Sequence, residues 1–391
     1  MDVLPSEEEQ MLKNLAREFL EGECPPSLAR AMELDELGYP PELWKKMADL
    51  GWTGLALPEL YGGQAMPLTY LAVILEEAGR AIAPVPLHST MMTALTIAEH
   101  ASEAQRKEIL PRVCSGDLIL TWAVTEVDPR FIPEAVKMQT TEDGEHFVIT
   151  GTKMFVDNLY AAEICLLACR TADATSENEG ISLLLLDTRS PGINNTPLTT
   201  LAKDKQSKVT FDGVRVPKAN LLGELNRGWP IIQWMLERGT ALLCAQMVGA
   251  TRKDADMAIE YAKNRVAFGR PIGSFQSIQH LCADMTIWVD GAQMLTYEAL
   301  WKIDQGMPAS VEVSQAKAFC NDKCEAVVRS SQSIHGGIGF MMEFDLHLWF
   351  RRVTSWTLRL GTSFEHRANV ARALLDTPGQ VRLGLPLITA S

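Results

Sequence analysis

Residues 118–126 read LILTWAVTE, and the pattern of the chain changes at this stretch. Over residues 118–217, β-branched and apolar runs of strand length are separated by turns, which predicts a region of β-strands. Residues 142–145 have the composition of a hairpin turn inside this region. Five runs are predicted as strands: LILTWAVTE (118–126), HFVITGTKMFV (146–156), EICLLACRT (163–171), GISLLLLD (180–187) and KVTFDGVRVP (208–217).

Helical patterns flank this region on both sides. Before it, Ser6 and Glu9 have the spacing of a capping box, and residues 66–82 form a mostly apolar helical run that stops before Pro84. The chain is therefore predicted to be all-α, then all-β, then all-α, which differs from the alternation that builds a doubly wound sheet. Helical periodicity after the strand region covers residues 229–262, 273–305, 309–334 and 363–376.

Composition narrows the class of protein. The 391 residues include 36 Lys and Arg against 49 Asp and Glu, which gives a net charge of −13. Hydrophobic residues make up 47% and charged residues 22%, and these values exclude a disordered chain, a collagen and a coiled-coil rod. Binding to a phosphate backbone needs clustered basic residues, so we expect no nucleic-acid partner. The acidic balance still leaves room for a local basic pocket.

Apolar run length, the N-terminal composition and the cysteine spacing indicate the cellular location and the metal content. No apolar run approaches the roughly 20 residues that span a bilayer, so we expect no membrane partner. The acidic N-terminus resembles neither a secretory signal nor an Arg-rich transit peptide, although a mature form would already have lost a transit peptide. The eight cysteines contain no Cys-x-x-Cys pair and no nearby histidine pair. We therefore expect reduced thiols, a cytoplasmic location and no metal site.

Motifs of several common enzyme classes are missing. The sequence has no phosphate-binding loop, no Gly-x-Gly-x-x-Gly after a strand, no Gly-x-Ser-x-Gly elbow and no His-Glu-x-x-His. Six other segments have ordinary interpretations when taken singly, such as a helix C-cap for a Gly-Gly pair or a surface turn for Thr-Glu. They are LPELYGG (57–63), WAVTE (122–126), GTKMFVDN (151–158), FDGVRVP (211–217), RVAFGRPI (265–272) with Phe275, Gln276 and Gln279, and QSIHGGIGF (332–340).

In these six segments, taken in order, the chain resembles the acyl-CoA dehydrogenase family. The resemblance covers nearly the whole length. It implies an α+β fold with an N-terminal all-α domain (1–118), a central β domain (119–226) and a C-terminal four-helix bundle (227–391). It also implies that FAD lies between the β domain and the bundle, and that the substrate is an acyl-CoA thioester.

The resemblance assigns FAD contacts to two groups of residues. In the first group, Thr125 and the backbone near Val124 would meet the pyrimidine edge of the flavin, and Phe155 stands where the family usually has Trp. By the resemblance, the second group would approach the adenosine diphosphate part from a neighbouring subunit, and glycine pairs and an arginine are chemically suited to a pyrophosphate. The first group is Trp122, Val124, Thr125, Phe155, Asp157 and Thr362; the second is Arg265, Phe268, Gln276, Gln332, Gly336 and Gly337.

Dehydrogenation next to a thioester needs a base for the α-proton. Many family members carry this Glu directly before a Gly-Thr pair, but here Leu360 precedes Gly361 and Thr362. Another branch places the Glu on an earlier helix in a Glu-Arg pair, and this chain has Glu237 followed by Arg238 there. The helical neighbours of Glu237 are uncharged, so burial should raise its pKa.

We therefore predict Glu237 as the catalytic base, although it could instead pair with a basic group on a neighbouring helix. Arg238, Leu360 and Gly361 are predicted to contact the substrate. Leu360 would line the pocket with an apolar wall, and the resemblance implies a bulky, branched or cyclic acyl group. The loop after Glu126 lacks the glycines usual in the family, and no substrate contact is assigned to it.

The resemblance also implies partners. Electrons would pass to an electron-transferring flavoprotein, and the chain would form a homotetramer. Residues 77–84 and 347–352 resemble a subgroup whose members pair with a larger relative, so a heterotetramer stays open. Two other functions stay open as well. One is an enoyl-CoA reductase or a base-independent eliminating enzyme of the same fold; the other is a non-catalytic partner subunit.

Overall fold

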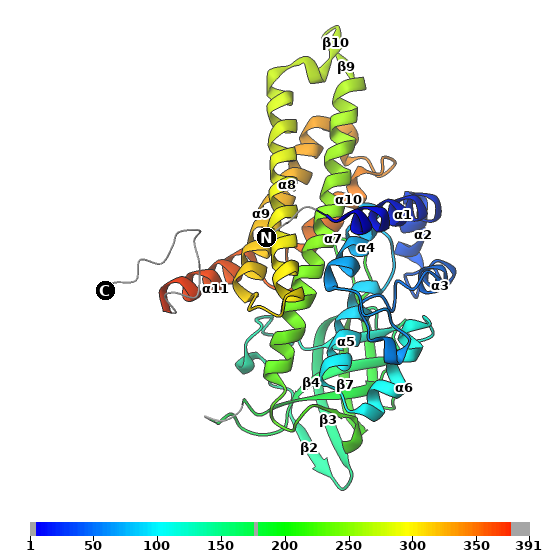
Figure 1. Ribbon diagram of the computed structural model, residues 1–391, viewed down its shortest axis with the longest axis vertical. Coiled ribbons are helices and arrows are strands. Elements are labelled where there is room, and N and C mark those ends of the chain that lie inside the picture. The colour runs from blue at the N-terminus through cyan, green and yellow to red at the C-terminus, as the bar shows by residue number, and fades with distance from the viewer. Residues whose placement is uncertain (1–4, 176–178, 377–391) are drawn as a thin grey trace.

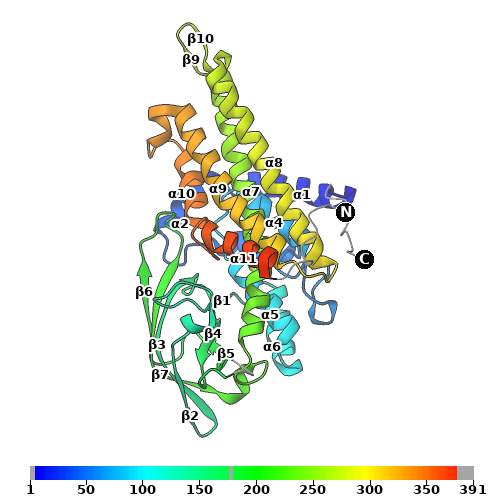
Figure 2. The same cartoon turned by 90° about the vertical axis from the view of Figure 1, so that its left-hand side faces the viewer.

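The computed structural model describes residues 5–175 and 179–376. The two four-stranded sheets lie towards one end of the long axis, and helix α7 (Trp229–Asn264) runs from there to the opposite end, with two further long helices packed alongside it (Figures 1 and 2). The predicted order of a helical part, a β part and a second helical part is confirmed. No helix in the described ranges combines the length and the apolar character that crossing a bilayer requires.

The described N-terminal part, from residue 5 onwards, contains six α-helices. The predicted capping box is confirmed, because the Ser6 hydroxyl accepts a hydrogen bond from the Glu9 amide at 3.1 Å and the Glu9 carboxylate accepts one from the Ser6 amide at 2.7 Å. The helix predicted over 66–82 is α4, which is buried over most of its length. The helices are α1 (Glu7–Glu23), α2 (Pro26–Leu34), α3 (Pro41–Asp49), α4 (Leu68–Arg80), α5 (Leu87–His100) and α6 (Glu103–Cys114).

The β part consists of two four-stranded sheets. All five predicted runs contain a strand (β1, β3, β4, β5 and β7), and the predicted hairpin joins β2 to β3 with Asp143 opposite His146. The sheet orders are β1-β4-β5-β8 and β2-β3-β7-β6, and apolar residues of both sheets share one core cluster. The strands are β1 (Leu120–Ala123), β2 (Thr140–Asp143), β3 (His146–Asp157), β4 (Ile164–Arg170), β5 (Ile181–Asp187), β6 (Ile193–Leu198), β7 (Gln206–Pro217) and β8 (Leu221–Leu222).

Up to residue 376, where the description of the chain ends, the C-terminal part contains the four predicted helices and one that the periodicity did not predict, α10 (Leu346–Trp356). A short two-stranded hairpin, β9 (Val266–Ala267) and β10 (Arg270–Pro271), joins α7 to α8 at the far tip of the molecule (Figure 1). Helix α9 ends in a short 3-10 helix, η5 (Gly336–Phe340). The helices are α7 (Trp229–Asn264), α8 (Gln276–Asp304), α9 (Ser310–His335), α10 (Leu346–Trp356) and α11 (Ser363–Asp376).

Candidate active site

A cavity of about 360 Å³ lies where the β part meets the segment after α10, and we call it the strand-side cavity. Trp122 reaches it from β1, Phe155 from β3 and Thr125 from the segment after β1. The opposite wall is formed by Leu358, Arg359 and Leu360. The structure therefore brings together three of the residues predicted to contact a flavin, with Phe155 joining Trp122 and Thr125 from about 30 positions further along the chain.

The walls of the strand-side cavity fit a flavin ring. Phe155 has a positive φ of 56° and a side chain that remains 45% exposed. The indole N–H of Trp122 is buried, and no described residue accepts its hydrogen bond. Such an unpaired donor is costly unless a ligand satisfies it. Apolar walls with one free donor and the Thr125 hydroxyl suit a planar heteroaromatic ring.

The other predicted residues of this group lie near the cavity without lining it. Val124 is buried, and its carbonyl accepts a hydrogen bond from the Lys153 ammonium at 3.1 Å. Thr362 caps α11, because its hydroxyl and amide each donate to the Glu365 carboxylate at 2.8 Å. Asp157 lies on the far side of Arg359, where it lines a third cavity that is described below.

An ion pair crosses the boundary between the β part and the C-terminal part. Asp157 at the end of β3 contacts the Arg359 guanidinium, which also donates a hydrogen bond to the Phe155 carbonyl at 3.3 Å. Burial raises the pKa of Asp157 to about 6, and the neighbouring Arg359 opposes this rise. Asp157 is therefore ionised at neutral pH and fixes Arg359 beside the strand-side cavity.

Glu237 lines a larger cavity of about 650 Å³, the helix-side cavity, between α7, α9 and α11. Leu360 and Gly361 line the same cavity, so the predicted base and two of the three predicted substrate contacts are brought together. The Glu237 side chain is 25% exposed. Burial raises its pKa, and Arg238 at 3.6 Å opposes the rise.

Arg238 takes a different direction from Glu237. Its guanidinium lies 3.7 Å from the centroid of the Trp234 ring and does not line the helix-side cavity. This stacking is a cation–π contact. Arg238 therefore packs back against Trp234 of its own helix, α7. Its predicted contact with the substrate stays a prediction.

Leu360 lies where these cavities meet. It is 5% exposed, has a positive φ of 55°, and lines both the strand-side and the helix-side cavities. The His366 ring Nε2 contacts the Leu360 carbonyl at 2.8 Å, and the Asn321 amide donates to the Gly361 carbonyl at 3.2 Å. The buried Lys317 donates to the Trp356 carbonyl at 2.8 Å. These contacts hold the segment that carries Leu360.

The second group of predicted FAD residues lies elsewhere. Arg265, Phe268 and Gln276 belong to the connection between α7 and α8, at the tip opposite the β part (Figure 1), and Phe268 is 94% exposed. Gln332, Gly336 and Gly337 lie where α9 ends. A single chain does not bring this group to the strand-side cavity.

The end of α9 nevertheless has features of a ligand surface. The side-chain amide oxygen of Gln332 (Oε1) is buried, and no described residue donates to it. Built Cβ atoms at Gly336 and Gly337 would meet no atom within 4 Å, so the backbone here is open to close approach. These features fit the adenosine diphosphate part of an FAD held by another subunit, as the resemblance implies.

Sequence reasoning did not find Arg359, His366 or Lys317. Arg359 and Lys317 act through partners distant in sequence, Asp157 at 202 positions earlier and Trp356 at 39 positions later, whereas His366 contacts the Leu360 carbonyl only six positions before it. The only sequence signal was proximity, because Arg359 directly precedes Leu360. The pairing itself depends on the packing of the C-terminal part on the β part.

Three family models match successive parts of the chain. The N-terminal domain of acyl-CoA dehydrogenase matches residues 6–117, the middle domain matches 121–214 and the C-terminal domain matches 226–375. The chain belongs to the acyl-CoA dehydrogenase family. Its members are FAD oxidoreductases that act on acyl-CoA, so the predicted family, fold and enzyme class are confirmed.

Individual relatives agree over the full length. A probable acyl-CoA dehydrogenase of Bacillus subtilis is 29% identical, covering 95% of this chain and 98% of its own. An acryloyl-CoA reductase (NADH) of Anaerotignum propionicum is also 29% identical, covering 96% of each chain. Within the acyl-CoA dehydrogenase family, proteins similar to this chain therefore carry the names of both dehydrogenases and reductases.

Solved structures of the family superpose closely. Butyryl-CoA dehydrogenase from Megasphaera elsdenii has a TM-score of 0.88 at 28% identity, covering 96% of this chain and 100% of its own. The ChsE4-ChsE5 complex from Mycobacterium tuberculosis has a TM-score of 0.88 at 26% identity, covering 97% and 100%. The second structure is a complex of two named components.

Proposed function

We propose that this chain catalyses the α,β-dehydrogenation of an acyl-CoA thioester with Glu237 as the base. The observation that carries the proposal is the meeting of Glu237 and Leu360 in the helix-side cavity. Glu365 is the other carboxylate among the lining residues, and it is engaged by Thr362 at the start of α11. Glu237 is free of such hydrogen bonds to described residues and can accept a proton.

The proposed roles follow from position. FAD, when bound, supplies the two-electron oxidation. Glu237 accepts the α-proton at its carboxylate, and burial brings its pKa closer to the useful range for a base. Leu360 and Phe131 present apolar surface in both cavities and exclude water between them. We further propose that the electrons leave to an electron-transferring flavoprotein.

The acyl group in this proposal is bulky, branched or cyclic. Leu360 cannot act as a base, and its side chain instead forms a wall shared by the two cavities. The helix-side cavity of about 650 Å³ also has the volume for more than a short straight chain. A panel of acyl-CoAs in a dye-reduction assay tests this, and a best substrate of butyryl- or octanoyl-CoA would contradict it.

The base is tested with Glu237→Gln. The amide keeps the shape of the side chain but cannot take a proton, so the variant should retain flavin absorbance while its bleaching by substrate slows at least about 100-fold. Glu365→Gln is the matched control from the same cavity and should bleach at a rate near that of the unaltered protein. Bleaching at an unaltered rate in Glu237→Gln would remove Glu237 from this role.

A second candidate function is a partner subunit in a heterotetramer with a related chain. Two observations favour it. A charged pair, Asp157 with Arg359, lies beside the strand-side cavity, and the two groups of residues predicted to contact FAD lie far apart within one chain. The chain purified alone separates the candidates. Yellow protein that is bleached by acyl-CoA supports the homotetrameric enzyme, whereas colourless protein that gains flavin only on co-expression supports the partner subunit.

The direction of the reaction and the compartment are proposals of the same kind. Reduction of an enoyl-CoA would use the same residues, with Glu237 returning the proton, and the assay above can be run in both directions. All eight cysteines are free in the structure, most of them buried. Free thiols support the reducing environment of the cytoplasm.

A further inference from the structure

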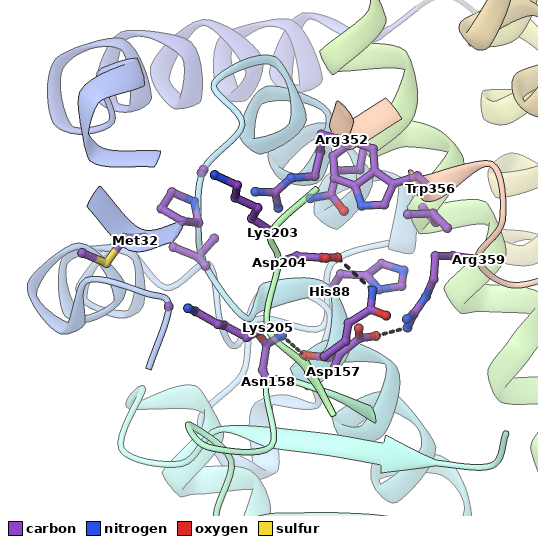
Figure 3. A pocket seen from close by; sticks show the side chains of 18 of the residues that line it. Met32, His88, Asp157, Asn158, Lys203, Asp204, Lys205, Arg352, Trp356 and Arg359 are labelled. Carbon is purple, nitrogen blue, oxygen red and sulfur yellow. Dashed lines mark hydrogen bonds and ion pairs between the residues drawn. The ribbon is translucent and has the colours of Figure 1, made fainter. Parts of the chain in front are cut away.

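A third cavity of about 90 Å³ lies between the N-terminal helices, the segment before β7 and α10, and we call it the polar chamber. Figure 3 shows charged side chains converging on it from these elements. Trp122, Gln206, Arg359 and Leu360 line both this chamber and the strand-side cavity. The chamber is therefore a neighbour of the proposed reaction site, on the other side of Leu360 and Arg359.

Positive charge exceeds negative charge in the lining. Four basic and three acidic side chains line the chamber, and one acid, Glu33, also pairs at 2.5 Å with Arg351 outside the lining. In a low-dielectric environment, the electrostatic attraction between this excess of positive charge and an anion is stronger than in water. The basic residues are Lys203, Lys205, Arg352 and Arg359, and the acidic residues are Glu33, Asp157 and Asp204.

Two of the acids are already neutralised by basic groups. Asp157 is paired with Arg359, and Glu33 lies 3.2 Å from the Lys203 ammonium. The third acid, Asp204, accepts hydrogen bonds from the Thr200 hydroxyl at 2.5 Å and the Gln206 amide at 2.9 Å. Both of these donors are uncharged, so Asp204 has no basic partner in contact among the described residues.

Two basic groups have no acid in contact. Lys205 donates to the backbone carbonyl of Glu33 at 3.1 Å. No described residue forms an ion pair or a hydrogen bond with Arg352, whose guanidinium lies 5.9 Å from the Trp356 ring centroid. A planar guanidinium with free donors is suited to bidentate binding of a carboxylate.

His88 forms part of the wall of the chamber without adding charge. Its ring Nε2 contacts the Gly239 carbonyl at 2.8 Å, which requires the proton on this nitrogen and leaves Nδ1 as an acceptor. Burial lowers the pKa of His88 to about 4, so the ring is neutral near pH 7. The anion affinity of the chamber therefore rests on the arginines and lysines.

We propose that the polar chamber binds a carboxylate at the far end of the acyl group, with Arg352 as its principal ligand. The substrate class is then a carboxyacyl-CoA, whose chain passes Leu360 and ends in the chamber. A volume of about 90 Å³ holds a carboxylate but not a whole acyl chain, which agrees with an end-group subsite. This inference rests on the proposed function for the position of the thioester.

The test compares two CoA thioesters of equal chain length, one ending in a carboxylate and one in its methyl ester. Quenching of tryptophan fluorescence measures binding without turnover, since Trp122 and Trp356 line the chamber. The carboxylate should bind about 10-fold more tightly, as expected for one bidentate arginine contact of about 1.4 kcal/mol. Arg352→Gln should abolish this preference, whereas Arg329→Gln, an exposed change on α9, should keep it.

Three results would overturn the proposal. The methyl ester could bind as tightly as the carboxylate, the preference could survive in Arg352→Gln, or free glutarate could bind as tightly as the carboxylated thioester. The last result would assign the chamber to free small anions. Failure of the proposed function would be recognised separately. Bleaching that persists in Glu237→Gln would contradict the role of Glu237 as the base, but it would not change the binding preference for the carboxylated thioester.

Discussion

Leu360 is held in a backbone conformation that non-glycine residues rarely adopt, at a cost of about 1–3 kcal/mol. The cost is offset by contacts at both ends of its segment. His366 contacts the carbonyl of Leu360, and Lys317 and Asn321 hold the flanking carbonyls of Trp356 and Gly361. The fixed backbone keeps the apolar side chain at the junction of the three cavities.

His366 gives this residue-scale arrangement a dependence on pH. Burial lowers its pKa to about 4, below the 6.5 of an unfolded histidine, so the unfolded chain binds the proton first. The neutral His366 contributes fully to the free energy of unfolding above pH 6.5. This contribution, up to about 3 kcal/mol, is lost as the pH falls from 6.5 towards 4. His366→Gln should make the loss between pH 7 and 4.5 smaller by about 2–3 kcal/mol, measured by urea unfolding.

The exposed His280 on α8 offers the control. His280→Gln removes a histidine without touching the segment that carries Leu360, so its loss of stability on acidification should match that of the unaltered protein. An equal loss in His366→Gln and in the unaltered protein would show that His366 is not responsible.

Between elements, a buried charge pair joins the end of β1 to β3. Lys153 is fully buried, and its ammonium contacts the Glu126 carboxylate at 2.8 Å. Glu126 also accepts hydrogen bonds from the amides of Lys137 and Met138, at 3.1 Å and 3.0 Å. The pair therefore fixes the loop after Thr125 against the sheet, and this loop borders both proposed ligand cavities.

Lys153→Met tests the pair. The variant leaves the Glu126 charge with no opposite charge in contact, so the free energy of unfolding should fall by about 3–5 kcal/mol. Lys153→Met combined with Glu126→Gln should recover most of that loss. Lys218→Met, which breaks the exposed pair with Glu142, should cost less than about 1 kcal/mol. A loss in Lys153→Met no larger than in Lys218→Met would contradict this account.

Across the whole molecule, the two helical parts are joined by a close crossing of α4 and α7. A Cβ built on Gly249 would lie 1.7 Å from the Glu76 carbonyl oxygen, and one built on Gly79 would lie 2.0 Å from the Gln246 carbonyl oxygen. Both obstacles are backbone atoms, so a side chain cannot be accommodated by a rotamer change. Glycine at these two positions lets the N-terminal part pack directly on the long helix that carries Glu237.

Gly249→Ala tests this crossing. The methyl group should force α4 and α7 apart and reduce the free energy of unfolding by about 3 kcal/mol, at the upper end for overpacking. Gly22→Ala in α1 is the matched control, because a Cβ there meets no atom within 4 Å. The control should be neutral or stabilising by up to about 1 kcal/mol, through helix propensity. Equal melting temperatures for both variants would contradict the close crossing.

The sequence by itself determined the elements with strong local patterns. The capping box at Ser6, five strand runs, the turn at 142–145 and four C-terminal helices are confirmed, because periodicity and turn composition act within a few residues. The missed elements include β6, whose sequence INNTPL is largely polar, and α10, a short helix buried against α7 and α9, and the short strands β8, β9 and β10 were not predicted either. Their structure depends on partners: β6 pairs along β7, and Trp349 of α10 donates to the Arg80 carbonyl.

For the site, sequence singled out Glu237, Leu360, Trp122, Thr125 and Phe155, and their resemblance to family motifs gave them roles. Only the tertiary structure decided which of them meet. It places Glu237 with Leu360, turns Arg238 onto Trp234, pairs Asp157 with Arg359 and encloses Arg352 in a polar chamber. The physical reason is that these contacts join residues up to hundreds of positions apart, and their free energy depends on burial that exists only once the three parts pack together.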